Sequence, residues 1–309
     1  MIERPRFRWP RERESVPAWI RAGGRAAAEA VRRRCDLAAL HRLAKRWRYR
    51  HVRGPVIVYQ MGRVGSVSVY RPLRARGLPH PVYHVHNLVG LDELERKIRA
   101  ARARPALSLE QIARDREIAR LIRSHPERRW NVVSLVREPV ARHVSAFFQE
   151  LDEYYPGIRA EYEAGRCDLD ALRAGFWARH ARHQLDAWFD EQLKPVFGID
   201  VFAAPFPTER GYLVARRGRT TLLLIRLEDL ERCVRRAFRD AFAIPDMRVG
   251  RDNGADERWY RDLYRRFLAE LVVPGSYLDE VYRSRFARHF YTPEELARFR
   301  TRWTRGARH

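Results

Sequence analysis

The segment from Val56 to Tyr70, V-I-V-Y-Q-M-G-R-V-G-S-V-S-V-Y, limits the fold of this chain more than any other stretch. Its apolar start is typical of a buried strand, and it passes through a glycine-containing turn into residues that can continue as a helix. In such a turn, glycine lets the backbone approach a ligand, while loop amides and the positive end of the next helix attract anions. The segment therefore predicts a phosphate-binding loop between a strand and a helix.

Side chains in this loop can complete an anion site. Arg63 supplies a positive charge, and Ser66 and Ser68 supply hydroxyl groups. The other residues of the expected cradle are Gly62, Val64, Gly65 and Val67. The Walker pattern for nucleoside triphosphates does not fit, because the basic residue lies between the two glycines and no lysine precedes the first serine. A P-loop kinase-like enzyme is therefore an alternative rather than the main hypothesis, as is an ordinary strand-to-helix connection.

Strand-like and helical segments alternate along the rest of the chain. The expected strands are Pro55–Tyr59, Val82–His86, Trp130–Val136, Gly211–Ala215 and Thr221–Ile225. Helices are expected at Ser66–Arg76, at Leu91–Arg104, from Ser108 to before Pro126, from about Pro139, at Leu169–Leu193, from Leu227, and in most of the chain after Ala255. This order predicts a three-layer α/β fold with a parallel sheet and a helical C-terminal region. Such sheets bind ligands at the carboxyl ends of their strands, where residues 60–66, residues 84–87 and Arg137 would meet.

The composition favours one large folded domain with a basic appendage. The 309 residues are 45% hydrophobic, which is enough to bury a full core. The net charge is +23, and residues 1–54 carry 16 basic and 5 acidic side chains. We expect a basic helical arm over residues 1–53, with helices at Val16–Arg34 and Leu37–Trp47, and an α/β domain over residues 54–309. So basic a chain attracts polyanions, and the arm could contact an anionic membrane surface.

Cysteine usage and hydropathy favour a cytoplasmic location. Cys35, Cys167 and Cys233 are too few and too scattered for a disulfide framework or a C-x-x-C metal site. Arginines interrupt the N-terminus, which lacks the apolar centre of a secretion signal, and no later stretch approaches the roughly 18 apolar residues of a membrane span. We expect a cytoplasmic protein that can lie at the inner membrane through its arm and has no specific nucleic-acid partner.

A second group of polar residues follows the strand that ends at Val136. Arg137 comes directly after this strand, Pro139 suits the first turn of a helix, and Ser145 lies further along that helix. Ser145 would be only about 9 Å along the helix axis, so a helix that folds back over the strand end can place both side chains on one phosphate. A structural arginine with an unrelated helix serine is the simpler alternative.

His86, at the end of the second strand, is the candidate general base. Alternation along the strand places His84 on the same face, where it can orient the other ring. An imidazole whose pKa is near neutrality can accept the proton of an attacking hydroxyl group. The alternatives are a pair of structural histidines, or a base elsewhere, with Glu150 or Asp152 as candidate carboxylates.

These motifs resemble those of sulfotransferases that use 3′-phosphoadenosine 5′-phosphosulfate (PAPS). Q-M-G-R-V-G-S-V-S is similar to their phosphosulfate loop, with Arg63 where the family usually has lysine. R-E-P-V-A-R-H-V-S-A-F-F resembles their second signature, whose arginine and serine hold the 3′-phosphate. H-V-H-N-L resembles the site of the catalytic histidine in many sulfotransferases, and glycan 2-O-sulfotransferases have a similar H-x-H. The resemblance implies a sulfotransferase fold of the P-loop-containing nucleoside triphosphate hydrolase type.

A wider resemblance covers about residues 54–303. W-F-D-E-Q-L-K-P-V-F-G-I-D-V-F, L-L-I-R-L-E-D-L, N-G-A-D-E-R-W-Y and R-H-F-Y-T-P-E-E-L look like a bacterial family of capsular polysaccharide synthesis proteins, itself sulfotransferase-like. The implied activity is transfer of a sulfuryl group from PAPS to a carbohydrate hydroxyl, without a metal, in the synthesis of a capsular or other cell-surface polysaccharide. The rival hypothesis from another class is a non-catalytic polyanion-binding protein on a degenerate sulfotransferase fold.

The resemblance also implies a role for each candidate residue. Arg63 would stabilise charge on the leaving phosphate, while the loop amides would hold the 5′-phosphate. Arg137 and Ser145 would select the 3′-phosphate. Arg258 would close over the nucleotide. His86, oriented by its neighbour, would take the proton from the acceptor.

Overall fold

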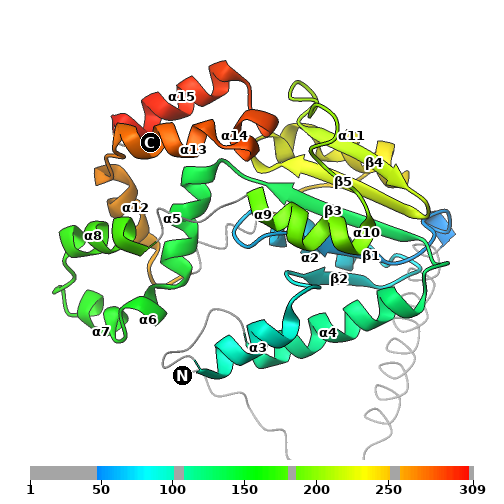
Figure 1. Cartoon of the computed structure of the whole chain (residues 1–309), viewed down its shortest axis with the longest axis horizontal. Coiled ribbons are helices and arrows are strands. Elements are labelled where there is room, and N and C mark those ends of the chain that lie inside the picture. The colour runs from blue at the N-terminus through cyan, green and yellow to red at the C-terminus, as the bar shows by residue number, and fades with distance from the viewer. Residues whose placement is uncertain (1–46, 101–107, 180–185, 251–257, 306–309) are drawn as a thin grey trace, which may run out of the picture. The chain divides into compact units, whose positions relative to one another are not determined.

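A five-stranded sheet forms the centre of the chain from Tyr49 onward, as Figure 1 shows. The computed structural model describes residues 47–100, 108–179, 186–250 and 258–305. The strands are β1 (Val56–Tyr59), β2 (Val82–Val85), β3 (Trp130–Val136), β4 (Tyr212–Arg217) and β5 (Thr220–Arg226). They lie side by side in the order β2-β1-β3-β5-β4.

Four of these strands are parallel, and the fifth is not. β1 pairs with β2 and β3, and β3 pairs with β5, in parallel ladders. β4 runs antiparallel to β5, with Arg217 opposite Thr220. Only Gly218 and Arg219 join these two strands, and so short a connection can form only an antiparallel hairpin. The expectation of a parallel sheet is therefore wrong at this edge.

The central strands are buried on both faces because their side chains are almost all apolar. Every residue of β1 is buried, and β3 is buried apart from Asn131. Such strands are typical of parallel sheets covered by helices on both sides. The ring of Tyr59 contacts Trp188 and Phe197 on one face, and Figure 1 shows α2 and α11 behind the sheet. The sheet is thus the middle layer of three.

Helices connect and cover the strands. Those nearest the sheet are α2 (Val67–Ala75), α3 (Leu91–Ala100), α4 (Leu109–Ser124), α5 (Pro139–Gln149), α9 (Asp186–Trp188), α10 (Lys194–Phe197) and α11 (Leu230–Phe242). Two further short turns are η1 (Phe189–Leu193), which is π-helical, and η2 (Leu227–Asp229), which is 3-10 helical. The predicted strand Trp130–Val136 and the predicted helix starts at Pro139 and near Ser108 are confirmed.

The expected helix Leu169–Leu193 has a different end in the structure. It begins as α8 (Leu169–Arg179), and residues 180–185 lie outside the described part. Beyond them, α9 continues through η1 into α10, so Pro195 does not stop the helix. Proline is tolerated here because it lies in the first turn of α10. Gly198, in the left-handed conformation, ends the segment instead.

A second hydrophobic cluster lies beside the sheet and is built by helices alone. Its members are α5, α6 (Leu151–Tyr154), α7 (Ile158–Glu163), α8, α12 (Arg261–Glu270), α13 (Gly275–Arg283), α14 (Arg285–Phe290) and α15 (Pro293–Thr304). Phe147 and Phe148 of α5 pack against Phe267 of α12 with ring centroids 5.9 and 5.0 Å apart. α5 therefore belongs to both regions, since it starts at the end of β3 and runs into this cluster (Figure 1).

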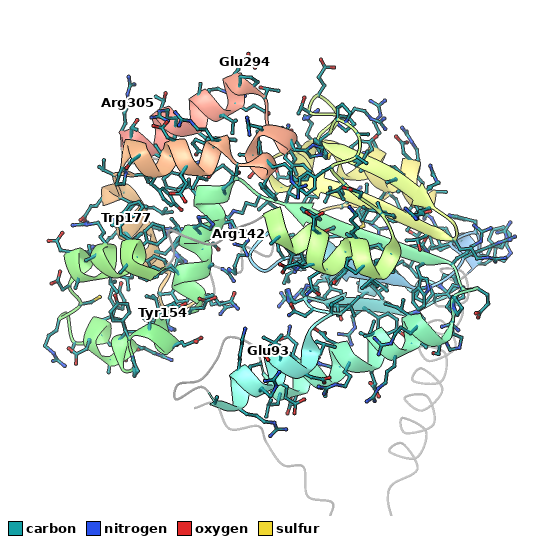
Figure 2. The ribbon with its side chains drawn as sticks, in the orientation of Figure 1. Glu93, Arg142, Tyr154, Trp177, Glu294 and Arg305 are labelled. Atoms are coloured by element: carbon teal, nitrogen blue, oxygen red, sulfur yellow. The ribbon has the colours of Figure 1, made fainter. Side chains whose placement is uncertain are left out.

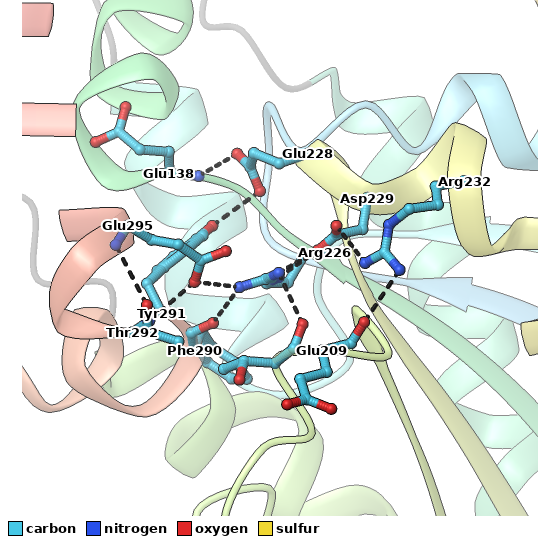
Figure 3. A network of polar contacts seen from close by, with 11 residues as sticks. Glu138, Glu209, Arg226, Glu228, Asp229, Arg232, Phe290, Tyr291, Thr292 and Glu295 are labelled. Atoms are coloured by element: carbon cyan, nitrogen blue, oxygen red, sulfur yellow. Dashed lines mark hydrogen bonds and ion pairs between the residues drawn. The ribbon is translucent and has the colours of Figure 1, made fainter. Parts of the chain in front are cut away.

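Arg226 joins the end of β5 to the C-terminal helices (Figure 3). Its side chain is 3% exposed, forms an ion pair with Asp229, and lies 2.7 Å from the carboxylate of Glu295. It also donates to the carbonyl of Phe290 at 3.1 Å. Glu295 completes a capping box with Thr292 at the start of α15. This network fixes the C-terminal helices against the sheet.

Glu138 makes the corresponding connection at the end of β3. Its buried carboxylate accepts from Val140 and Ala141 at the N-terminus of α5, and also from Tyr282 and Trp303. Burial raises the pKa of this carboxyl group, and the hydrogen bonds oppose that rise. Glu138 therefore joins the first turn of α5 to Tyr282 and Trp303, and this connection fixes the direction in which α5 leaves the sheet.

The N-terminal helices expected over residues 16–34 and 37–47 fall outside the described residues, except for Trp47. Tyr49 and Val52 are 4% and 3% exposed and belong to the main core. Among the helices that the structure describes, none has the length and apolar character needed to cross a bilayer.

Candidate active site

The loop after β1 has an unusual backbone at two positions. Arg63 and Gly65 have φ angles of 72° and 74°, in the left-handed region. Glycine adopts this region easily, and a Cβ atom at position 65 would lie 2.6 Å from Cδ1 of Leu227. An arginine is strained there and keeps the conformation only where its surroundings hold it. Close packing and side-chain contacts therefore define the loop.

The contacts that hold Arg63 come from α5. Its Nε and Nη2 donate to the hydroxyl of Ser145 at 3.1 and 2.8 Å, and its Nη1 donates to Gln149. In return, Arg137 donates to the carbonyl of Arg63 at 3.2 Å, and Arg142 donates to the carbonyl of Gly62 at 3.0 Å. The predicted phosphate loop and the segment that carries Arg137 and Ser145 thus lie in direct contact.

Three guanidinium groups meet at this loop, and among the described residues no carboxylate forms a hydrogen bond with any of them. The hydrogen bonds of Arg63, Arg137 and Arg142 within the described residues go to neutral oxygen atoms. Burial lowers the pKa of Arg63, and the charges of Arg258 and Arg137 lower it further. Burial likewise lowers the pKa of Arg142 to about 10; the charge of Glu150 opposes this shift, and the charges of Arg137 and Arg63 add to it. So much buried positive charge is costly in the free protein and favourable beside an anion.

Arg142 was not predicted as a site residue, although the sequence carried a signal for it. Figure 2 shows it on the side of α5 that faces the sheet. It precedes Ser145 by three positions, so the two side chains share one helix face. The same spacing rule that placed Ser145 near a phosphate therefore also places Arg142 there.

The histidine pair lies at the end of the neighbouring strand. His84 and His86 are on the same face, as alternation predicted, with ring centroids 4.9 Å apart. Nε2 of His84 lies 2.9 Å from the hydroxyl of Ser66, and its ring stacks on Tyr70 of α2. The side-chain amide of Gln60 lies 3.0 Å from the same hydroxyl and 3.1 Å from Nδ1 of His86. One polar network therefore joins the loop to both imidazoles.

Both imidazoles are in environments that favour the neutral form. Burial lowers the pKa of His84 to about 4, and the charges of His86 and Arg114 act in the same direction. Burial also lowers the pKa of His86, with a contribution from Arg63, while the backbone carbonyl of Gln60 opposes it. Near neutral pH both rings are therefore mainly neutral, and each has a nitrogen that can accept a hydrogen bond or act as a base.

Two side chains, one of them buried, hold the segment that carries His86. Asp115 of α4 is 1% exposed and accepts from the backbone N–H groups of His86 and Asn87 at 3.4 and 3.2 Å. Gln192, in the π-helical turn η1, accepts from the backbone N–H of Leu88 at 3.0 Å and of the next residue at 3.2 Å. Such turns are frequent at functional sites. The residues after β2 are consequently fixed from two helices.

A cavity of about 570 Å³ opens beside the loop and α2. Its walls include Ser68, Leu227, Leu230 and Val249, with Glu228 contributing a carboxylate. Cavities of a few hundred Å³ with apolar walls and a few polar groups suit small ligands. Ser68 was expected in the phosphate cradle, but the structure places it at this cavity.

The remaining predicted residues occupy different positions around the loop. Val64 is fully buried, whereas Val67 is 37% exposed at the start of α2. Arg258 is exposed and acts on Arg63 through its charge. Tyr260, two residues further on, is 4% exposed and its hydroxyl has no hydrogen-bond partner among the described residues. This hydroxyl was missed by sequence reasoning, because nothing in the pattern separates it from core tyrosines.

In a comparison with known protein families, residues 170–292 match the model of a family described as "Putative capsular polysaccharide synthesis protein". The matched segment runs from α8 to the cap of α15 and includes η1, the β4–β5 hairpin and Arg226, while Glu295 of the Arg226 network lies beyond it. No curated protein and no solved structure matches the chain significantly.

Proposed function

We propose that this protein is a sulfotransferase that moves a sulfuryl group from PAPS to a hydroxyl of a carbohydrate. The observation that carries the proposal is the contact between Arg63 and Ser145, at 2.8 Å from Nη2 to Oγ. It unites the loop after β1 with the segment after β3, and Arg137 reaches the same loop. Two motifs that resemble sulfotransferase signatures thus form one basic site.

The residues present suit a ligand with two separate phosphate positions. Arg137 and Arg142 carry charge that no carboxylate hydrogen bond satisfies in the described residues, and the buried hydroxyl of Tyr260 is available as a donor. Gly65 lets Leu227 pack closely against the loop, where a Cβ atom would clash with it. The loop and Arg63 would hold the 5′-phosphosulfate, Arg137 and Ser145 the 3′-phosphate, and the neighbouring cavity the nucleoside.

The chain's own residues would act on the acceptor and on the leaving phosphate. When bound, PAPS supplies a sulfuryl group, so that an S–O bond to the acceptor forms as the S–O bond to the 5′-phosphate breaks. His86 accepts the acceptor's hydroxyl proton, since its lowered pKa leaves the ring neutral. Arg63 stabilises the negative charge that develops on the bridging phosphate oxygen. Asp115 and Gln192 keep the base in place through the backbone around it.

A cell-surface or capsular polysaccharide is the acceptor class that we propose. Its support is the match of residues 170–292 to a family described by polysaccharide synthesis. The match does not extend to the loop or to Arg137. The proposed donor therefore rests on the geometry of the site, and the proposed acceptor rests on the family match. A peripheral position at the inner membrane, through residues 1–53, is part of the same proposal.

Calorimetry tests the donor. The protein is titrated with 3′-phosphoadenosine 5′-phosphate and, separately, with ATP and Mg²⁺. We expect metal-independent binding of the bisphosphate and weaker binding of ATP, with bisphosphate binding lost in Arg63→Ala. Preference for ATP with Mg²⁺ would instead support a P-loop kinase-like enzyme. Transfer of labelled sulfate from PAPS to polysaccharide extracts then tests the reaction itself.

A further inference from the structure

Gln60 lies at the centre of the network between the loop and the histidines. It is the first residue after β1 and is 0% exposed. Its Nε2 lies 3.0 Å from Oγ of Ser66, 3.1 Å from Nδ1 of His86 and 3.5 Å from Nε2 of His84. The other end of the amide, Oε1, is buried without a hydrogen-bond partner among the described residues. Three polar groups therefore lie close to the Nε2 end of this amide.

The orientation of this amide decides which imidazole nitrogen carries a proton. With Nε2 facing the network, His86 must accept at Nδ1, so its neutral ring is protonated at Nε2. Ser66 then accepts from Gln60 and donates to Nε2 of His84. In this arrangement the lone pair of the His86 ring is occupied by Gln60, and this ring cannot act as a base.

The opposite orientation satisfies the same contacts with the roles reversed. The two ends of an amide have nearly the same shape, so Oε1 can occupy the place that faces the network. Its two lone pairs then accept from the hydroxyl of Ser66 and from Nδ1–H of His86, while Nε2–H of His84 donates to Ser66. Nε2 of His86 is left with a free lone pair. Each orientation leaves one end of the amide unpartnered within the described residues, and only the second leaves a lone pair on His86 for base chemistry.

We propose that Gln60 is a positioning residue that accepts from Nδ1–H of His86 and thereby keeps Nε2 of that ring free as the base. The inference rests on the proposed function, because it concerns the same general base. It adds a link between donor and acceptor sides, since Ser66 belongs to the anion-binding loop and shares the amide with His86. The backbone carbonyl of Gln60 also favours a protonated nitrogen on this ring.

Imidazole nitrogen NMR tests the tautomer without any assay of activity. Long-range ¹H–¹⁵N spectra of the full chain, with His86→Gln to assign the signals, are recorded at a pH where the ring is neutral. We expect the wild-type ring to be protonated at Nδ1, and Gln60→Met to shift it toward Nε2–H. Gln111→Met, the same exchange in α4, is the control and leaves the spectrum of His86 unchanged. A wild-type ring protonated at Nε2, or one that Gln60→Met does not alter, would overturn the assignment.

Gln60→Glu separates the acceptor role from the donor role. A carboxylate can accept from Nδ1–H but cannot donate to Nδ1, so we expect this variant to keep sulfate transfer within about tenfold of wild type. Gln60→Met should lose about 10²-fold or more in kcat, the scale of a general base in the wrong tautomer. Greater loss in Gln60→Glu than in Gln60→Met would contradict the acceptor role. If the wild type transfers no sulfate but the NMR result holds, the proposed function fails and the tautomer assignment stands.

Discussion

The hydroxyl of Ser145 accepts hydrogen bonds from both Nε and Nη2 of Arg63, which lies 82 positions earlier in the chain. Ser145 is 6% exposed and sits on α5, whereas Arg63 is held in a left-handed conformation in the loop after β1. The contact makes a strained loop depend on a helix that begins at the end of another strand. A ligand that binds one of these two side chains should therefore also affect the other.

Replacement of Arg137 by alanine should weaken bisphosphate binding selectively. A charge-assisted hydrogen bond contributes about 1.5 to 3 kcal/mol, so affinity for 3′-phosphoadenosine 5′-phosphate should fall roughly ten- to hundredfold. Adenosine 5′-phosphosulfate lacks the 3′-phosphate, and its affinity should hardly change. Calorimetry with both ligands measures the difference, with Arg123→Ala on the exposed end of α4 as control. Equal losses for both ligands would count against a 3′-phosphate contact.

Replacement of Arg142 by methionine should separate binding from stability. The largely apolar methionine side chain removes a buried charge that repels two neighbouring guanidinium groups, so the free protein should change by no more than about 1 kcal/mol. Bisphosphate affinity should still fall about tenfold or more, because the anion loses one cation. Urea unfolding with and without the ligand measures both effects. Large destabilisation of the free protein would show that Arg142 serves the loop rather than an anion.

His86→Ala should reduce turnover while leaving donor affinity within about threefold. A general base contributes about 10²- to 10⁴-fold in rate, and His84→Ala should cost less unless the pair acts as a unit. A base works only when deprotonated, and burial together with Arg63 lowers the pKa of His86. The acidic limb of the pH profile should therefore lie below the usual histidine range and flatten in His86→Ala. Wild-type turnover in that variant would move the base to His84, Glu150 or Asp152.

Much of this arrangement was predictable from local patterns. The apolar run Trp130–Val136 has the bounds of β3, and alternation placed His84 and His86 on one face. These predictions worked because side-chain direction in a strand follows from the sequence alone. The meeting of Arg137 with the loop that carries Arg63 was predicted from the rule that parallel strands gather functional groups at their carboxyl ends, whereas the contact of Arg63 with Ser145 was not.

Other features were missed. The antiparallel direction of β4 could have been predicted, because the expected strands Gly211–Ala215 and Thr221–Ile225 leave only five residues between them, too few for a parallel crossover. Gln192 reaches the segment after β2 from the π-helical turn η1, which has no sequence signature. Asp115 differs, because it lies three positions after Ile112 on the buried face of α4. An acidic residue on an apolar helix face is a signal that the sequence analysis could have used.

Asp115→Asn should change stability in a way that depends on pH. Burial raises the pKa of this carboxyl group from 3.8 to about 6, even though two backbone N–H groups favour the charged form. A raised folded-state pKa means that the group's contribution to stability is complete below pH 3.8 and is lost as pH rises through about 6. At about 1.36 kcal/mol per pKa unit, the stability lost by neutral pH is up to about 3 kcal/mol.

Asparagine carries no charge, and its carbonyl can still accept from the backbone of His86 and Asn87. The free energy of unfolding of Asp115→Asn, relative to wild type, should therefore increase by up to about 3 kcal/mol between pH 4 and pH 7. Urea unfolding across this range measures the difference. Asp92→Asn, at a surface carboxylate paired with Arg116, is the control and should show a much smaller change. A difference in the free energy of unfolding that stays constant with pH would mean that burial does not destabilise the carboxylate of Asp115. The charged carboxylate would then hold the segment carrying His86 without reducing the stability of the fold.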